Sequence, residues 1–311
     1  MSWEEHLPPE ARVERGAAMS AWTTFRLGGP ARAIVHCEEP NACAATVRAL
    51  RAAGERFECV GGGSNLLVSD AGLDEIVVRY ASDDLRLRPE GADLVVAGSS
   101  PLDALAAYAV DAGLDGWTFA TGIPGTVAGA LAGNAGAFGE QMADRLVRAS
   151  LLDPDGAIRE VPPAELGFGY RSSAIAERGA IVLEVRLRAW PGDRDRLRSE
   201  RERIRKFRSE RHPDWRTVPT AGSFFRNIEP TSAAVRRQAA GWYLERAGAK
   251  GLHVGGAGVF PKHANIIVKE KPSCTAQDVL LLSRWMAAAV KEKFGLSLVR
   301  EVRLLGGFDA L

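Results

Sequence analysis

The sequence predicts an α+β protein of about two domains, and three observations support this fold class. The 311 residues, 46% of them hydrophobic, suffice for about two domains of roughly 150 residues. Segments typical of helices and of strands mix along the chain without the strict alternation of a doubly wound sheet. A densely charged stretch of helical composition at residues 193–211 marks a boundary. We therefore expect an N-terminal domain over residues 20–192 and a smaller C-terminal domain over residues 193–307.

The N-terminal domain is expected to be rich in short strands. Apolar runs bounded by turn residues predict strands at residues 31–37, 57–60, 66–68, 76–79, 94–97, 147–152, 158–161 and 181–190. One helix starts at about residue 41 and can end at Gly54, and another starts at about residue 103 and can end at Gly113. The turn sequence Asp153-Pro154-Asp155-Gly156 joins two of the strands into a hairpin.

Beyond the charged stretch 193–211, the C-terminal domain is expected to hold two helices and two strands. A helix is predicted at about residues 232–246 and a strand at about residues 266–268. Thr275, with Asp278 three residues later, has the spacing of a capping box and opens a long helix. A last strand is predicted over residues 296–305.

Charge and composition exclude several function classes. Forty Lys and Arg against 39 Asp and Glu give a net charge of +1 without long blocks of one sign, so nucleic acid is not an expected partner. No apolar run approaches the ~20 residues of a membrane helix, and the acidic first ten residues do not resemble a signal peptide. A cytoplasmic location is therefore expected.

Histidine and cysteine spacing gives no sign of a metal site. The five histidines show neither HxH nor HxxxH spacing. The cysteines form no CxxC pair, and most lie in apolar stretches; they are Cys37, Cys43, Cys59 and Cys274. We expect structural thiols and no metal.

Two glycine-rich segments carry the first functional signal. Backbone without side chains can approach a phosphate or a flat ring and direct several N–H groups at it. Gly61-Gly62-Gly63-Ser64-Asn65 follows a predicted strand, which suits such a role, although a plain tight turn explains it equally well. The second segment, residues 122–136, repeats glycine at positions 125, 129 and 133, a spacing that can also serve close helix packing.

Neither segment fits the common nucleotide motifs. There is no GxxxxGK[ST], no GxGxxG after the first strand, and no lysine before Lys206. A phosphate in the N-terminal domain would therefore be held by backbone N–H groups, hydroxyls and arginine.

Several short sequence motifs match those of one known family, and they occur in the same order. They are Thr24–Ala31, Gly61–Leu67, Gly122–Thr126, Phe168–Ser173, Ala221–Asn227, Ala240–Trp242, His263–Asn265 and Glu301–Arg303. Together they resemble the UDP-N-acetylenolpyruvoylglucosamine reductases over about residues 20–307. Each motif alone is weak evidence for the family, but the occurrence of all of them in the family's order is specific.

The resemblance implies a fold, a reaction and a cofactor. The fold would be an FAD-binding domain of the PCMH or vanillyl-alcohol-oxidase-like type followed by a smaller α+β substrate domain. NADPH would reduce noncovalent FAD, which then reduces UDP-N-acetylglucosamine enolpyruvate to UDP-N-acetylmuramate for peptidoglycan synthesis, in a monomeric enzyme. The implied FAD-binding residues are Gly61, Gly62, Gly63, Ser64, Asn65, Thr121, Gly122, Ile123, Pro124, Gly125, Thr126, Gly129, Asn134 and Gly136.

Three residues match the family's catalytic positions. Arg171 would hold the substrate carboxylate, a task that suits a planar guanidinium. Ser223 would give the proton to carbon, and Glu301 would stabilise the enolic intermediate. An ion pair for Arg171, a turn hydroxyl for Ser223 and a pair with Arg303 for Glu301 are the structural alternatives. Strand alternation predicts Glu301 on one face with Arg303.

The sequence also departs from the family pattern. No tyrosine occurs between Tyr170 and Tyr243, so it resembles the subtype without the tyrosine loop, and the UDP end must be held in another way. Arg211, Asn227 and His263 are candidates for contacts to substrate or NADPH. For Arg211, a solvated helix end is the alternative.

Two other functions compete with this hypothesis. An oxidase would keep the FAD site and use O₂, but no histidine lies beside either glycine segment for flavin attachment. A non-catalytic binding module would have lost its acid, whereas Ser223 is present. Purified protein that NADPH bleaches would separate these functions.

Overall fold

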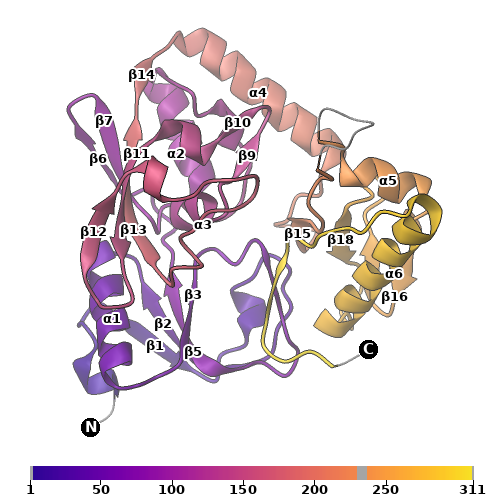
Figure 1. Ribbon diagram of the computed structural model, residues 1–311, viewed down its shortest axis with the longest axis horizontal. Coiled ribbons are helices and arrows are strands. Elements are labelled where there is room, and N and C mark those ends of the chain that lie inside the picture. The colour runs from indigo at the N-terminus through magenta and orange to yellow at the C-terminus, as the bar shows by residue number, and fades with distance from the viewer. Residues whose placement is uncertain (1–2, 230–236, 310–311) are drawn as a thin grey trace. The chain divides into compact units, whose positions relative to one another are not determined.

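The structure, a computed structural model, describes residues 3–229 and 237–309 (Figure 1). By internal contacts the chain divides into two compact units. The first unit contains residues 3–15, 32–62 and 75–207, and the second contains residues 16–31, 63–74, 208–229 and 237–309.

One sheet of the first unit contains four strands in the order β1-β2-β5-β3. Their bounds are Arg12–Arg15 for β1, Ala31–Cys37 for β2, Phe57–Val60 for β3 and Leu73–Tyr80 for β5. Helix α1 (Pro40–Ala52) packs against this sheet through Val47 and Leu50, in a core shared with Ile76 and Val78. Gly54 follows the helix at φ +68°, the left-handed conformation expected at its end.

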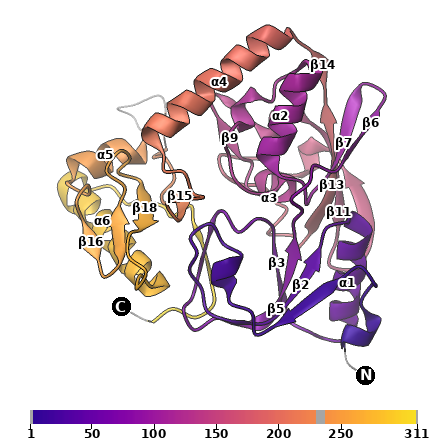
Figure 2. The ribbon, with the colours of Figure 1, turned by 180° about the vertical axis from the view of Figure 1, so that it is seen from behind.

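The second sheet of the first unit has five strands in the order β12-β11-β13-β7-β6, each antiparallel to its neighbour. The bounds are Leu87–Glu90 for β6, Asp93–Ala97 for β7, Leu146–Leu152 for β11, Ile158–Val161 for β12 and Ile181–Arg188 for β13. Helices α2 (Leu102–Ala112) and α3 (Val127–Ala132) lie beside this sheet (Figure 2). Leu105, Trp117, Leu131 and Val185 belong to their common core.

Smaller elements complete the first unit. Strand pairs form between β8 (Leu114–Asp115) and β14 (Trp190–Pro191), and between β9 (Gly136–Ala137) and β10 (Glu140–Gln141). Short 3₁₀ helices span Trp3–His6, Thr118–Ala120, Met142–Arg145 and Pro163–Glu165. Helix α4 (Arg194–Arg211) starts among the residues of the first unit and ends among those of the second.

The second unit is built on a four-stranded antiparallel sheet in the order β15-β18-β17-β16. Its strands are Thr220–Ser223 (β15), His253–Val254 (β16), Ala257–Val259 (β17) and Ile266–Lys269 (β18). A parallel pair joins β4 (Leu66–Val68) to β19 (Arg303–Leu305). The helices are α5 (Ala240–Arg246), α6 (Ala276–Phe294) and the 3₁₀ turn Met19–Ala21.

The second unit includes two segments that we expected in the N-terminal domain. Residues 16–31 and 63–74 supply Phe25, Leu27 and Leu67 to a core that also contains Phe224 and Met286. Apolar burial therefore groups these segments with the C-terminal chain. The division at residues 192 and 193 stays a prediction of domain limits.

Many predicted elements are present with nearly the expected bounds. The hairpin β11–β12 pairs Leu152 with Ile158, and its turn closes with a hydrogen bond from the Gly156 N–H to the Asp153 carbonyl. The capping box of α6 forms between Thr275 and Asp278. Among the described residues, no helix is both long and apolar enough to cross a bilayer.

The last predicted strand is wrong in extent. Only Arg303–Leu305 forms a strand, and residues 296–302 lack one because their backbone groups bond elsewhere. The Arg226 N–H donates to the Val299 carbonyl and the Glu301 N–H to the Phe224 carbonyl. The alternation that grouped Glu301 with Arg303 on one strand face therefore does not apply.

Two other predicted elements differ from the structure. The helix predicted from residue 232 begins at Ala240, residues 237–239 are not helical, and residues 230–236 lie outside the described part. The strand predicted over residues 181–190 divides into β13 and β14. Several strands were not predicted, because they are short or lack an apolar pattern: β1, β6, β8, β9, β10, β15, β16 and β17.

Candidate functional site

The two glycine-rich segments lie against each other in the first unit. A Cβ on Gly61 would lie 2.4 Å from the Thr126 Oγ1, and a Cβ on Gly62 would lie 3.0 Å from the Gly125 Cα. Neither Gly61 nor Gly62 has a positive φ, so close approach, not turn geometry, requires glycine there. Gly63 belongs to the second unit, where its Cβ would lie 2.1 Å from the Trp22 carbonyl oxygen.

The loop 121–126 is fixed at both ends by side chains. The Asp103 carboxylate accepts a hydrogen bond from the Gly122 N–H at 2.9 Å and pairs with Arg201 at 3.1 Å. Arg201, whose side chain is 13% exposed, donates to the Thr121 Oγ1 at 3.3 Å. At the other end the Thr126 hydroxyl accepts the Gly129 N–H and caps α3. Sequence reasoning missed Asp103 and Arg201, since no motif links a helix start to a distant charged helix.

Arg171 lies at the tip of a tight turn. Gly169 and Ser172 exchange backbone hydrogen bonds of 3.0 and 3.4 Å across this turn. Arg171 has φ +53°, an uncommon conformation for a side chain of this size. Its Nη2 donates to the Gly136 carbonyl at 2.8 Å, and its guanidinium lies 5.3 Å from the centre of the Tyr170 ring. The guanidinium is therefore held before any ligand binds.

Asn134 joins this turn to the end of the second glycine segment. It is 1% exposed at φ +43°, and its Nδ2 donates to the Gly169 carbonyl at 2.9 Å. Its Oδ1 accepts the Ala143 N–H at 3.1 Å. The structure thus brings Asn134, Gly136 and Arg171 together in the first unit.

In the second unit, a β-bulge precedes Ser223. Thr220 pairs with Val268 and Ser223 with Ile266, so β15 has one more residue than β18 over this stretch. Gly222 takes φ +76°, and its N–H donates to the Thr220 Oγ1 at 3.1 Å. An extra residue changes the face to which the following side chain points. The half-buried Ser223 is therefore oriented by the bulge.

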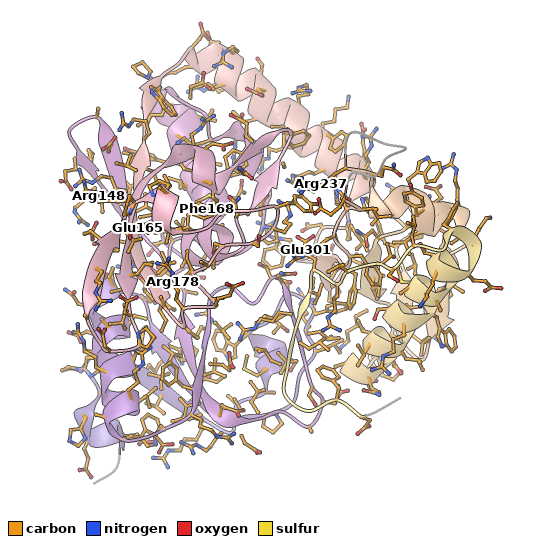
Figure 3. The ribbon with its side chains drawn as sticks, viewed as in Figure 1. Arg148, Glu165, Phe168, Arg178, Arg237 and Glu301 are labelled. Atoms are coloured by element: carbon orange, nitrogen blue, oxygen red, sulfur yellow. The ribbon has the colours of Figure 1, made fainter. Side chains whose placement is uncertain are left out.

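Glu301 and Asn65 meet the segment that follows Ser223. The Glu301 N–H donates to the Phe224 carbonyl at 2.8 Å, and its own carbonyl accepts the Asn65 Nδ2 at 3.1 Å. The Arg303 N–H in turn donates to the Asn65 carbonyl at 3.0 Å. Figure 3 labels Glu301 on this stretch. The end of the first glycine segment, the proposed acid and Glu301 thus converge within one unit.

The three ligand candidates of the second unit have different surroundings. Asn227 uses its Oδ1 to accept the Ala240 N–H at 3.2 Å, which fixes the start of α5. Arg211 is exposed at the end of α4 and pairs with Glu210 at 3.3 Å. His263 accepts the Asn265 N–H through its Nδ1 at 3.3 Å.

His263 faces His212 in a partly buried pair. The ring centres are 5.2 Å apart. Burial lowers the pKa of His212 to about 4, and His263 and Arg208 act in the same direction. Burial is also the main cause of the lowered pKa of His263. Both rings are therefore neutral at pH 7.

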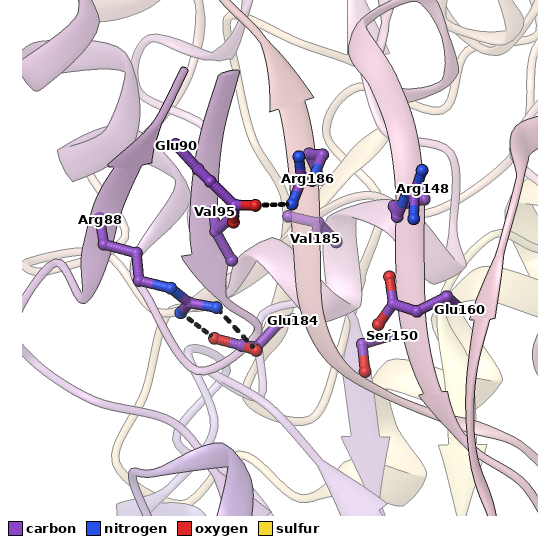
Figure 4. A pocket seen from close by; sticks show the side chains of 9 residues that line it. All are labelled: Arg88, Glu90, Val95, Arg148, Ser150, Glu160, Glu184, Val185 and Arg186. Atoms are coloured by element: carbon purple, nitrogen blue, oxygen red, sulfur yellow. Dashed lines mark hydrogen bonds and ion pairs between the residues drawn. The ribbon is translucent and has the colours of Figure 1, made fainter. Parts of the chain in front are cut away.

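A charged depression lies on the five-stranded sheet of the first unit (Figure 4). It has a volume of about 230 Å³ and contains three arginines and three glutamates among its lining residues, so the charges balance. Arg88 pairs with Glu184 at 2.6 Å, and Arg186 pairs with Glu90. No predicted site residue lies there. In the described part of the chain, no group of three or more His, Cys, Asp or Glu is placed to hold a metal.

Comparison with known proteins assigns the family. Residues 212–305 match the model described as UDP-N-acetylenolpyruvoylglucosamine reductase, C-terminal domain, and residues 31–162 match an FAD binding domain. A protein named UDP-N-acetylenolpyruvoylglucosamine reductase from Nostoc punctiforme is 35% identical over 304 residues, covering 96% of this chain and 88% of the relative. The chain belongs to the UDP-N-acetylenolpyruvoylglucosamine reductase family. A second reductase, from Anaeromyxobacter dehalogenans, is 38% identical over 314 aligned residues, covering 99% of this chain and 91% of the relative.

A solved structure supports the same family at the level of the fold. The crystal structure of UDP-N-acetylenolpyruvylglucosamine reductase from Thermus caldophilus has a TM-score of 0.79 to this reductase at 32% identity. The match covers 95% of this chain and 100% of that chain. The predicted fold class, an FAD-binding domain of the PCMH type followed by an α+β domain, is confirmed, as is the predicted family.

The residues present in this reductase fit FAD. The absence of a Cβ at Gly61 and Gly62 lets this segment pack directly against Gly125 and Thr126, so the backbone groups of the two segments lie together, which suits binding of a pyrophosphate. The loop 121–126 offers backbone N–H groups and hydroxyls, as required in a domain without an early lysine.

Proposed function

We propose that this reductase uses NADPH to convert UDP-N-acetylglucosamine enolpyruvate to UDP-N-acetylmuramate in peptidoglycan precursor synthesis. The observation that carries the proposal is the convergence of Asn65, the segment after Ser223 and Glu301 in the second unit. Bound FAD supplies hydride transfer between NADPH and the enolpyruvyl group. The protein's own residues then have to bind the carboxylate, stabilise charge and deliver one proton.

The FAD is proposed to bind without a covalent bond. Gly61, Gly62 and the loop 121–126 of the first unit would hold it, with Gly129, Asn134 and Gly136. Gly63, Ser64 and Asn65 are also candidates for FAD contacts. Acid precipitation should release the yellow chromophore into the supernatant. Colour that stays in the pellet would contradict noncovalent binding.

Each of the three proposed catalytic residues has a separate role in the reduction of the enolpyruvyl group. Hydride addition at the methylene carbon develops negative charge at the neighbouring carbon and its carboxylate, which requires stabilisation and a proton. Arg171 binds the carboxylate with its guanidinium. Ser223 donates the proton through its hydroxyl, and Glu301 stabilises the enolic intermediate.

Further parts of the proposal concern ligands and location. Arg211, Asn227 and His263 would contribute to binding of substrate or NADPH, in an enzyme without the tyrosine loop. A cytoplasmic location is proposed, because charged NADPH and UDP-sugars do not cross membranes unaided. The enzyme is also proposed to be a monomer. The FAD-binding domain would span residues 20–192 and the substrate domain residues 193–307.

One experiment tests the reaction as a whole. FAD-loaded protein is mixed with NADPH without oxygen, and the flavin absorbance should bleach. Addition of UDP-N-acetylglucosamine enolpyruvate should then restore the yellow colour. A flavin that stays yellow with NADPH contradicts a reductase and favours a binding module. Bleaching by a sugar or alcohol in place of NADPH would favour an oxidase.

A further inference from the structure

The side chain of Asn265 is bonded to the segment that carries Ser223. Asn265 is 2% exposed and lies just before β18 in the second unit. Its Oδ1 accepts the Phe225 N–H at 3.0 Å, and its Nδ2 donates to the Phe225 carbonyl at 2.8 Å. Its own carbonyl accepts the Phe224 N–H at 2.8 Å. Three hydrogen bonds from one residue therefore fix the two residues that follow Ser223.

The same segment also fixes Glu301. The Phe224 carbonyl accepts the Glu301 N–H at 2.8 Å, and Phe225 forms an isolated bridge with Arg300. The groups of Phe224 and Phe225 thus bond both to Asn265 and to the stretch that ends at Glu301. A displacement of this segment would shift Ser223 and Glu301 together.

Asparagine is the residue type that this position requires. A side-chain amide offers an acceptor and a donor at once, so it can satisfy both backbone groups of Phe225. Aspartate keeps the acceptor but places an oxygen against the Phe225 carbonyl. An apolar residue would leave two buried backbone groups without their bonds, which is costly in a buried setting.

We propose that Asn265 is a positioning residue for the proton transfer, acting through the backbone of Phe224 and Phe225 and not by contact with substrate. The inference rests on the proposed function. A displacement of about 1 Å at a reacting group can cost on the order of 10²-fold in rate. Reduction of FAD by NADPH needs no proton donor aimed at the sugar substrate. Only the oxidative half-reaction should therefore depend on Asn265.

The test compares Asn265→Asp and Asn265→Ser with the unchanged FAD-loaded protein in stopped-flow absorbance. Flavin reduction by NADPH should stay within about twofold, and reoxidation by UDP-N-acetylglucosamine enolpyruvate should slow about 10- to 100-fold. Hydrogen exchange gives a second readout without substrate. The amides of Phe225 and Glu301 should exchange about tenfold faster in the variants, while those of α6 should not change.

Ser283→Ala is the matched control. Ser283 is buried in α6 of the same unit, and its hydroxyl donates to the Leu280 carbonyl at 2.7 Å. The variant loses a buried hydrogen bond away from Ser223, so both half-reactions should keep their rates. This separates a positioning effect from a general loss of stability.

Two results would overturn the inference: equal slowing of both half-reactions, or unchanged reoxidation in a variant whose amides exchange faster. If one variant fails to fold, the other carries the same comparison. If the unchanged protein is bleached by NADPH but not reoxidised by the substrate, the proposed function fails. Hydrogen exchange then decides alone: faster exchange at Phe225 and Glu301 supports the holding role, and unchanged exchange rejects it.

Discussion

The two units prepare their proposed site residues by different physical means. In the first unit, the site depends on space and on strained backbone. Side chains at Gly61 and Gly62 would collide with the facing loop, and both Asn134 and Arg171 have positive φ. In the second unit, it depends on hydrogen bonds, since Asn265 fixes the segment after Ser223.

This difference follows from what each unit would have to do. A cofactor that lies against backbone needs side chains to be absent, so added carbon atoms should be the most damaging change there. A proton donor needs a fixed position, so loss of a polar group should be the most damaging change in the second unit. The two units should therefore respond to opposite kinds of substitution.

The largest effect is expected for Ser223→Ala, because it removes the proposed acid without adding bulk. Loss of a positioned general acid typically costs about 10²–10⁴ in rate. Reoxidation of reduced flavin by substrate should fall by that factor, while reduction by NADPH should survive. Ser223→Cys should restore part of the rate, since a thiol is the stronger acid. Equal effects on both half-reactions would transfer the acid role to Glu301, to be tested by Glu301→Gln.

Gly61→Val tests the first unit in the opposite way, by adding atoms. Its Cβ would lie 2.4 Å from the Thr126 Oγ1, so we expect purified protein to lose most of its FAD. Gly125→Leu should do the same, because φ at Gly125 is +105°. Gly133→Ala is the control, since its Cβ would lie an ordinary 3.5 Å from the nearest atom. The ratio of flavin to protein absorbance measures each outcome, and full loading of Gly61→Val would reject the proposed cradle.

The regular elements were largely predictable because their signals are local. Glycines at left-handed positions and capping boxes act within one turn, so the ends of α1, α2 and α6 follow from Gly54, Gly113 and Thr275. The start of α5 did not follow, because its cap is the distant Asn227. Strand 296–305 was wrong for a similar reason: its residues bond to Phe224 and Arg226, and the sequence pattern cannot show such partners.

The sequence motifs predicted which residues form the candidate site, but not the contacts that hold them in place. The resemblance predicted Arg171, Ser223 and Glu301, and each stays a proposed catalytic residue. The bulge at Gly222 and the Asp103–Arg201 pair depend on tertiary contacts, which leave no periodic pattern in the sequence. Asn265 was noted only as the last residue of the motif His263–Asn265.

A pH effect should test the partly buried histidine pair of the second unit. The pKa of His212 is lowered to about 4 in the folded protein, against about 6.5 when unfolded. The unfolded chain therefore binds more protons below pH 6.5, and stability falls as the pH drops from about 6.5 to about 4. Allowing for partial exposure, we expect a loss of about 2 kcal/mol from His212 over this range.

Urea unfolding at pH 7.5, 6 and 5 measures this loss. His212→Gln removes the titrating group, so its stability should depend less on pH than that of the unchanged protein. His253→Gln, at an exposed position paired with Glu270, is the control and should keep the full dependence. Parallel pH curves for the unchanged protein and His212→Gln would show that His212 is not the cause.

The smallest effect is expected for Arg211→Ala, which asks whether the second-unit end of α4 binds a ligand by charge. Arg211 is exposed at the end of α4, and its surface ion pair with the neighbouring Glu210 contributes little to stability. If it contacts a phosphate, the KM for NADPH or for the UDP-sugar should rise about fivefold, which corresponds to about 1 kcal/mol. Because salt screens charges at the surface, about 0.5 M salt should reduce this difference. Arg203→Ala is the matched control: Arg203 is on the same helix but among the residues of the first unit, and its side chain is 72% exposed. Equal KM values for the two variants at low salt would mean that Arg211 is a solvated helix end. Ligand binding in the second unit would then depend, like proton transfer, on buried hydrogen bonds and not on surface charge.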